Sequence, residues 1–185
     1  VMALPNVAFY DTQPMAKMRP LATDESGSAV SLEELDIESF GAANYTQLTW
    51  RSLIDGWACT SCARCQDVCP AYASGKALNP MQIIHDVRNY ANDYASQLFA
   101  GESPEEDIIA RFGEESIWAC TTCHACVDVC PVNIEHVPKL TDARRHLMME
   151  RMEFDEAVED TIMPLMATIE NLESDSNPYL SLIHI

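Results

Sequence analysis

A run of four cysteines occurs twice in the chain, and together the two copies contain all eight of its cysteines. The runs are Cys59-x2-Cys62-x2-Cys65-x3-Cys69-Pro70 and Cys120-x2-Cys123-x2-Cys126-x3-Cys130-Pro131. The copies also agree beside the cysteines, since Trp-Ala precedes the first cysteine and Asp-Val precedes the fourth in both runs. A duplication this detailed indicates two equivalent binding loops within one fold.

Cysteines three residues apart, with a further cysteine directly before proline, are typical of the loop that binds a [4Fe-4S] cluster in bacterial ferredoxins. The sequence therefore predicts two [4Fe-4S] clusters. In two-cluster ferredoxins the fourth cysteine of each run ligates the cluster of the other run. The expected ligands are Cys59, Cys62, Cys65 and Cys130 for cluster one, and Cys120, Cys123, Cys126 and Cys69 for cluster two. Because neither half completes its own site, we expect the two halves to fold together around the metal.

Two other uses of eight cysteines fit this pattern less well. Disulfides belong to oxidising compartments and do not require a repeated three-residue spacing, which instead favours metal binding in a reducing compartment. Four-cysteine zinc sites usually combine two Cys-x2-Cys pairs, whereas each run here adds a third cysteine and then Cys-Pro. Zinc stays open as the alternative metal.

Composition and missing motifs exclude several functions. The formal net charge is -18, from 29 acidic and 11 basic residues, and such a surface repels nucleic acid and anionic lipid headgroups. No nucleic-acid partner is therefore expected. The chain has no Ser-His-Asp set, glycine-rich phosphate loop or dinucleotide fingerprint, so we expect no substrate-converting site in it. It has no signal peptide and no apolar run near the roughly 20 residues of a membrane helix, so by itself it is expected to be soluble.

Helical spacing dominates the chain from about residue 45 onward. Apolar residues from Trp50 to Trp57 share one helical face, with Thr49 or Thr46 as the N-cap. Further helices are expected over residues 80–99, from a capping box at Ser103 to 112, from Pro138 to about 152, and over 155–173. No segment alternates with the period of a strand. The sequence therefore predicts an all-α fold built around the two clusters.

Four residues inside the runs are candidates for tuning the cluster potentials. Thr60 and Thr121 follow the first cysteines, and their hydroxyl groups are expected either to donate to a sulfur or to face solvent. A cation at Arg64 or His124 would raise the potential of a nearby cluster, and for His124 this effect would depend on pH. The other histidines on or beside the predicted helices are expected to be surface or packing residues: His85, His136 and His146.

Three sequence features resemble the α-helical dicluster ferredoxin domain of heterodisulfide-reductase-related iron-sulfur proteins, including the membrane-bound ETF:quinone oxidoreductase type. They are Trp57-Ala58-Cys59-Thr60 in the first run, Lys76-x-Leu78-x-Pro80 opening a helix, and Val137-Pro138 after the second run. The resemblance covers roughly residues 45–179. In the membrane-bound members of that family the domain follows a haem-binding membrane domain and precedes cysteine-rich CCG domains.

The resemblance also suggests how the chain is divided. Residues 1–44 are interpreted as an extended acidic connector, 45–152 as the dicluster domain, and 153–179 as a helical segment leading to a CCG region outside this chain. Residues 180–185 match one reading frame of a transposase end sequence used to prepare sequencing libraries. We therefore interpret them as an adapter-derived tail.

These inferences predict electron transfer as the function. The resemblance implies a module that passes electrons from a flavoprotein donor, such as an electron-transfer flavoprotein, to quinone or a disulfide. It also implies attachment to the cytoplasmic face of a membrane through an N-terminal domain outside this chain. Two alternatives stay open: an iron-sulfur subunit of a glycolate oxidase or anaerobic glycerol-3-phosphate dehydrogenase, and a structural or sensing metal module.

Overall fold

The computed structural model describes residues 3–8, 40–102, 104, 106–151, 160, 161 and 164. The chain divides into two compact units, residues 1–150 and 151–185. Apart from residues 160, 161 and 164, the segment predicted over 153–179 and the tail predicted over 180–185 lie outside the described residues. So do residues 9–39, the main part of the predicted connector.

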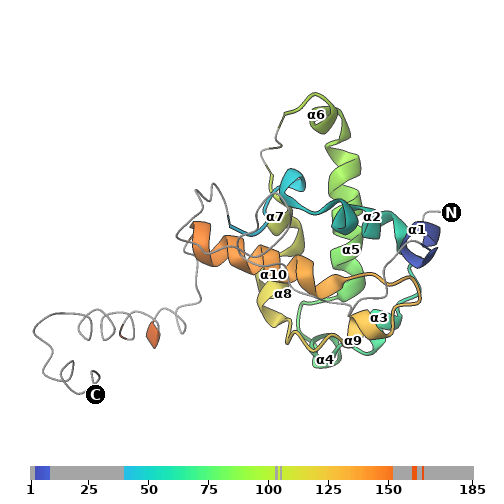
Figure 1. The fold of residues 1–185 in the computed structure, drawn as a ribbon. Helices are drawn as coiled ribbons and strands as arrows, with labels where there is room; N and C mark the ends of the chain where they lie inside the picture. Colours follow the sequence, from blue (N-terminus) through green and yellow to red (C-terminus); the bar gives the residue numbers. More distant parts are fainter. Residues whose placement is uncertain are drawn as a thin grey trace, which may run out of the picture. The chain divides into compact units, whose positions relative to one another are not determined.

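Every regular element in the described part of the chain is a helix, which confirms the predicted all-α fold (Figure 1). In order these are α1 (Ala3–Ala8), η2 (Tyr45–Gln47), α2 (Trp50–Ala58), α3 (Arg64–Asp67), α4 (Pro70–Ala73), α5 (Pro80–Asp93), α6 (Ala95–Phe99), α7 (Ile108–Phe112), α8 (Glu114–Ala119), α9 (Ala125–Asp128), α10 (His136–His146) and η3 (Leu147–Arg151). Helix η2 is a single 3-10 turn, and η3 has π-helical hydrogen bonding. Helix α1 was not expected, since it lies within the predicted extended connector.

Local capping explains where the main helices begin. Thr49 caps α2, its side chain accepting a hydrogen bond from the Ser52 backbone N–H at 3.1 Å. Asn79 caps α5 in the same way, accepting from two backbone N–H groups ahead of the N-terminal proline. The predicted capping box at Ser103 was wrong. Helix α7 begins at Ile108 instead, where the Asp107 carboxylate accepts from the Ala110 N–H at 2.8 Å.

Two predicted helix boundaries also differ from the structure. The helix predicted over residues 80–99 is interrupted at Tyr94, which separates α5 from α6. The helix predicted from Pro138 begins two residues earlier, at His136, and its last turn widens into η3. The earlier start matters for function, because it brings His136 onto α10.

Helix α5 forms the centre of the core. It contacts α2, α3, α7 and α10, and its buried face includes Ile84, Val87 and Tyr90, all 0% exposed (Figure 1). The predicted apolar stripe is therefore the face that packs. Helices α3, α4 and α9 gather near the N-terminal end of α5, and α3 contacts α9 directly. This end of the molecule carries the cysteine runs.

Candidate metal centres

The two cysteine runs adopt the same local conformation. In each, a helix ends one residue before the first cysteine, and a short helix, α3 or α9, carries the third. Between them, two residues at matched positions have positive φ angles: Ser61 (55°) and Ala63 (61°) in the first run, Thr122 (53°) and His124 (62°) in the second. Non-glycine residues adopt this region at a cost, so its repetition indicates a requirement of the binding loop.

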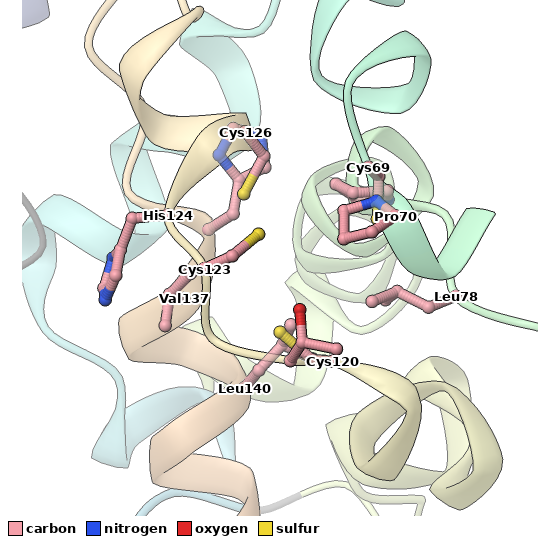
Figure 2. Close-up of a pocket in the computed structure, with 12 residues that line it drawn as sticks. Cys69, Pro70, Leu78, Cys120, Cys123, His124, Cys126, Val137 and Leu140 are labelled. Atoms are coloured by element: carbon pink, nitrogen blue, oxygen red, sulfur yellow. The ribbon is translucent and has the colours of Figure 1, made fainter. Parts of the chain in front are cut away.

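One pocket is lined by four cysteines from both runs. Cys120, Cys123 and Cys126 come from the second run, and Cys69 is the last cysteine of the first run. Figure 2 shows their side chains around a common space, with Leu140 and Val137 of α10 at its wall and Pro70 and Leu78 on the opposite side. The space measures about 330 Å³, including its open mouth.

A second pocket of similar size has the converse composition. Cys59, Cys62 and Cys65 of the first run line it together with Cys130, the last cysteine of the second run, around about 300 Å³ including its mouth. The structure therefore groups the eight cysteines into the two foursomes that the crossed assignment requires. In each foursome the second cysteine, Cys62 or Cys123, is the exposed one.

Backbone N–H groups approach the cysteine sulfurs in both pockets. The N–H of Thr122 donates to Cys120 Sγ and that of Ile134 donates to Cys130 Sγ, each at 3.4 Å. A hydrogen bond from the Arg64 backbone N–H is the main cause of a lowered pKa at Cys62. Such donors stabilise negative charge on sulfur, as iron-sulfur centres need. Thiolate ligands, N–H donors and apolar walls thus fit an iron-sulfur cluster.

The most deeply buried thiols lie where the two pockets adjoin. Cys65 and Cys126 belong to one hydrophobic cluster with Val127 and Val137. Burial is the main cause of raised pKa values, about 11 for Cys65 and about 12 for Cys126. Both are therefore thiols at neutral pH until a metal displaces their protons. Among the described residues, no group of three His, Cys, Asp or Glu side chains could hold a single metal ion.

The four candidate tuning residues line the pockets in different ways. Thr60 and Arg64 line the first pocket; the Thr60 side chain hydrogen-bonds to Cys62, and the charge of Arg64 also helps to lower the Cys62 pKa. Thr121 and His124 line the second pocket. The imidazole of His124, however, points away from the space between the sulfurs (Figure 2). Its left-handed backbone conformation turns the side chain outward.

Sequence reasoning missed three residues beside the runs. His85 of α5 lies with Nε2 3.7 Å from Cys59 Sγ and 3.0 Å from Ser61 Oγ, so it is not merely a packing residue. Arg144 of α10 donates to the Cys120 carbonyl at 2.5 Å and the Ile117 carbonyl at 2.6 Å, which fixes the entry to the second run. His136 lines both pockets. A helical pattern shows which face is buried but not which loop that face meets.

Comparison with known families bears on the same residues. A family model described as a 4Fe-4S dicluster domain matches residues 58–134, which include all eight cysteines. Residues 58–134 are a 4Fe-4S dicluster domain. The match confirms the predicted cofactor, two [4Fe-4S] clusters, and electron transfer as the function of the dicluster domain.

Curated relatives extend the similarity beyond the dicluster domain. A probable membrane-anchored ferredoxin of Chromohalobacter salexigens is 37% identical over 67% of this chain and 22% of its own length. An EtfAB:quinone oxidoreductase of Syntrophomonas wolfei is 32% identical, over 78% of the chain and 22% of the relative. A subunit of the dihydromethanophenazine:CoB–CoM heterodisulfide reductase of Methanosarcina barkeri is 30% identical, over 66% and 26%.

These relatives are much longer than the chain, which spans about a quarter or less of each. They agree with the resemblance to heterodisulfide-reductase-related proteins. No solved structure matches the chain. In the described residues, no helix has both the length and the apolar character needed to cross a membrane.

Proposed function

We propose that this chain is the electron-transfer module of a larger, membrane-associated oxidoreductase of the heterodisulfide-reductase-related type. The observation that carries the proposal is the crossed grouping of the eight cysteines, three from one run and the last from the other in each pocket. On this basis Cys59, Cys62, Cys65 and Cys130 hold cluster one, and Cys120, Cys123, Cys126 and Cys69 hold cluster two. The clusters supply one-electron redox chemistry, and the protein fixes their positions and potentials.

The adjoining pockets support a relay between the clusters. Cys65 and Cys126 lie in one hydrophobic cluster, and α3 contacts α9, so the two foursomes share a dry boundary. At the outer side of each foursome the exposed cysteine, Cys62 or Cys123, is accessible to a partner. An electron can therefore enter beside one exposed cysteine, cross the buried boundary and leave beside the other.

The partners are redox proteins, and the relatives suggest their kind. An electron-transfer flavoprotein is the proposed donor and quinone the proposed acceptor, as in the name of the Syntrophomonas wolfei relative, with a disulfide as the alternative acceptor. Membrane attachment at the cytoplasmic face is proposed to come from a domain outside this chain, in line with the membrane-anchored relative. Thr60, Thr121, Arg64 and His124 are proposed to tune the potentials.

Anaerobic reconstitution with iron and sulfide tests the proposal. The expected product contains iron and acid-labile sulfide for two [4Fe-4S] clusters, and its EPR signals appear on reduction and disappear on reoxidation. Reduced electron-transfer flavoprotein should reduce the reconstituted chain faster than a Cys62→Ala, Cys123→Ala variant. A colourless product would refute the cluster assignment, and clusters that cannot be reduced reversibly would favour a structural or sensing role.

A further inference from the structure

A single side chain lines both cluster pockets. His136, the first residue of α10, is the one described residue common to the two linings. It directly precedes Val137, which packs with Cys65 and Cys126 at the boundary between the pockets. The imidazole therefore lies between the two cysteine foursomes.

This imidazole is buried and incompletely hydrogen-bonded. His136 is only 2% exposed, and its Nδ1 has no hydrogen-bond partner among the described residues. An unpaired ring nitrogen inside a protein costs free energy, so a buried histidine normally finds a partner. The groups that the dicluster domain adds at this position are the sulfur atoms of its clusters, which accept hydrogen bonds.

The surroundings of His136 favour an uncharged ring. Burial and the nearby ammonium of Lys139 lower its pKa to about 4, although Asp55 and the Ile134 backbone act in the opposite direction. A neutral imidazole can still donate one N–H, and it does so without adding a net charge between the clusters.

The first turn of α10 holds His136 in a fixed position. Lys139 Nζ donates to the Glu135 carbonyl at 2.8 Å and to Asp55 at 2.6 Å, and the Glu135 N–H approaches Asp55 at 3.3 Å. These bonds tie the start of α10 to α2. A donor held this firmly can discriminate between two neighbouring acceptors.

We propose that His136 is a hydrogen-bond donor placed between the two clusters, with its buried Nδ1–H directed at a sulfur atom of one of them. Hydrogen bonds to cluster sulfur raise the reduction potential, because they stabilise the additional negative charge of the reduced state. The bond makes the two potentials unequal and so favours one resting place for the electron. This inference rests on the proposed function, since it requires both clusters.

Redox titration of the reconstituted chain, followed by EPR, tests the inference with His136→Leu. Loss of the donor is expected to lower the potential of one cluster by about 59 mV or more, a tenfold change in a one-electron equilibrium, and to move the other less. His136→Gln, which retains an N–H donor, should recover much of the shift. His124→Leu is the matched control, because His124 lines one pocket with its ring pointing away, and it should change neither potential by as much.

The outcomes separate the inference from the proposed function. Unchanged potentials in a His136→Leu protein that retains both clusters would overturn the inference alone, whereas wild-type protein without reducible clusters would overturn the proposed function and the inference with it. If His136→Leu does not assemble, pulsed EPR decides on protein labelled with ¹⁵N-histidine in a His85→Gln, His124→Gln background. Coupling of a ¹⁵N nucleus to a reduced cluster is expected, and its absence would contradict the proposal.

Discussion

Asp55 of α2 and Lys139 of α10 form an ion pair, with Lys139 Nζ 2.6 Å from Asp55 Oδ2 and both side chains fully buried. Asp55 also accepts a hydrogen bond from Asn6 of α1 at 2.7 Å. Helix α2 leads into the first cysteine run, and α10 follows the second, so the pair joins the two halves of the duplicated unit beside the clusters. Neither partner contacts solvent, and each depends on the other to compensate its charge.

Removing one partner of this pair should destabilise the fold strongly. Asp55→Asn leaves the Lys139 ammonium buried without a counter-charge, which is expected to cost about 3–5 kcal/mol of unfolding free energy. Anaerobic denaturant titration of the cluster-loaded protein measures the loss, and the rate of cluster bleaching should rise with it.

The double variant Asp55→Asn, Lys139→Met provides the control for charge. Because it removes both charges, it should recover a large part of the stability lost in Asp55→Asn. A double variant as unstable as the sum of the two single variants would show that the residues do not act as a pair.

The crossed ligand assignment predicts which cluster each final cysteine supports. Cys130 belongs to the second run but lines the pocket of Cys59, Cys62 and Cys65. Cys130→Ala should therefore remove or convert cluster one while cluster two keeps its EPR signal, and Cys69→Ala should do the reverse. Iron analysis and EPR of the two variants check this. Selective loss of the cluster in the variant's own run would contradict the crossing.

Gly41 is expected to tolerate no side chain. Its φ is +74°, and a Cβ atom would lie 2.2 Å from the Asp142 carbonyl oxygen and 2.6 Å from the His146 nitrogen, both on the backbone of α10. Gly41→Ala should cost roughly 2–4 kcal/mol of stability, from overpacking and from the left-handed conformation together.

Gly75→Ala is the matched control for Gly41. Gly75 has a similar φ of +80°, but nothing lies within 4 Å of the place that a Cβ atom would take. It should show only the conformational part of the cost, roughly 1–2 kcal/mol. Equal losses in the two variants, measured by chemical denaturation, would argue against a tight contact between Gly41 and α10.

Tyr94 should contribute to alkaline pH dependence. Its hydroxyl donates to the Glu106 carboxylate at 2.7 Å, and this hydrogen bond is the main cause of a pKa raised above 10.0. Because the folded-state pKa exceeds the unfolded value, the contribution to stability is complete below pH 10.0 and is lost as pH rises through the folded pKa. The stability difference between wild type and Tyr94→Phe should therefore shrink above about pH 10.

Titration of tyrosinate absorbance identifies the Tyr94 component by subtraction of the Tyr94→Phe curve. Glu106→Gln removes the negative charge and should bring the Tyr94 pKa back toward 10.0. A component that titrates at or below pH 10.0 in the wild type would contradict the hydrogen-bond explanation.

Local sequence chemistry accounts for much of this fold. Thr49 and Asn79 begin their helices where the capping pattern predicts, because a cap depends only on a few neighbouring residues. The spacing of Cys59, Cys62 and Cys65 likewise acts within one short loop. The all-α fold and the two clusters were predictable because each is encoded at short range.

The residues that sequence reasoning misjudged depend on contacts between distant segments. His136 was expected to be a surface or packing residue, yet it lines both pockets because α10 begins two residues before Pro138. His85 meets Cys59 across the packing of α5 against the first run. His124 is inside the run but points outward, since its backbone is left-handed.

The sequence by itself therefore determined the cofactor, the number of cysteine sites and the helical class, because spacing and capping are local properties. Only the tertiary structure decided which side chains share the space between the sites. The burial of Asp55 with Lys139, and of His136 between the foursomes, arises from segments about eighty residues apart in the chain. Packing sets the positions of such residues, and packing depends on the whole chain rather than on any one stretch of it.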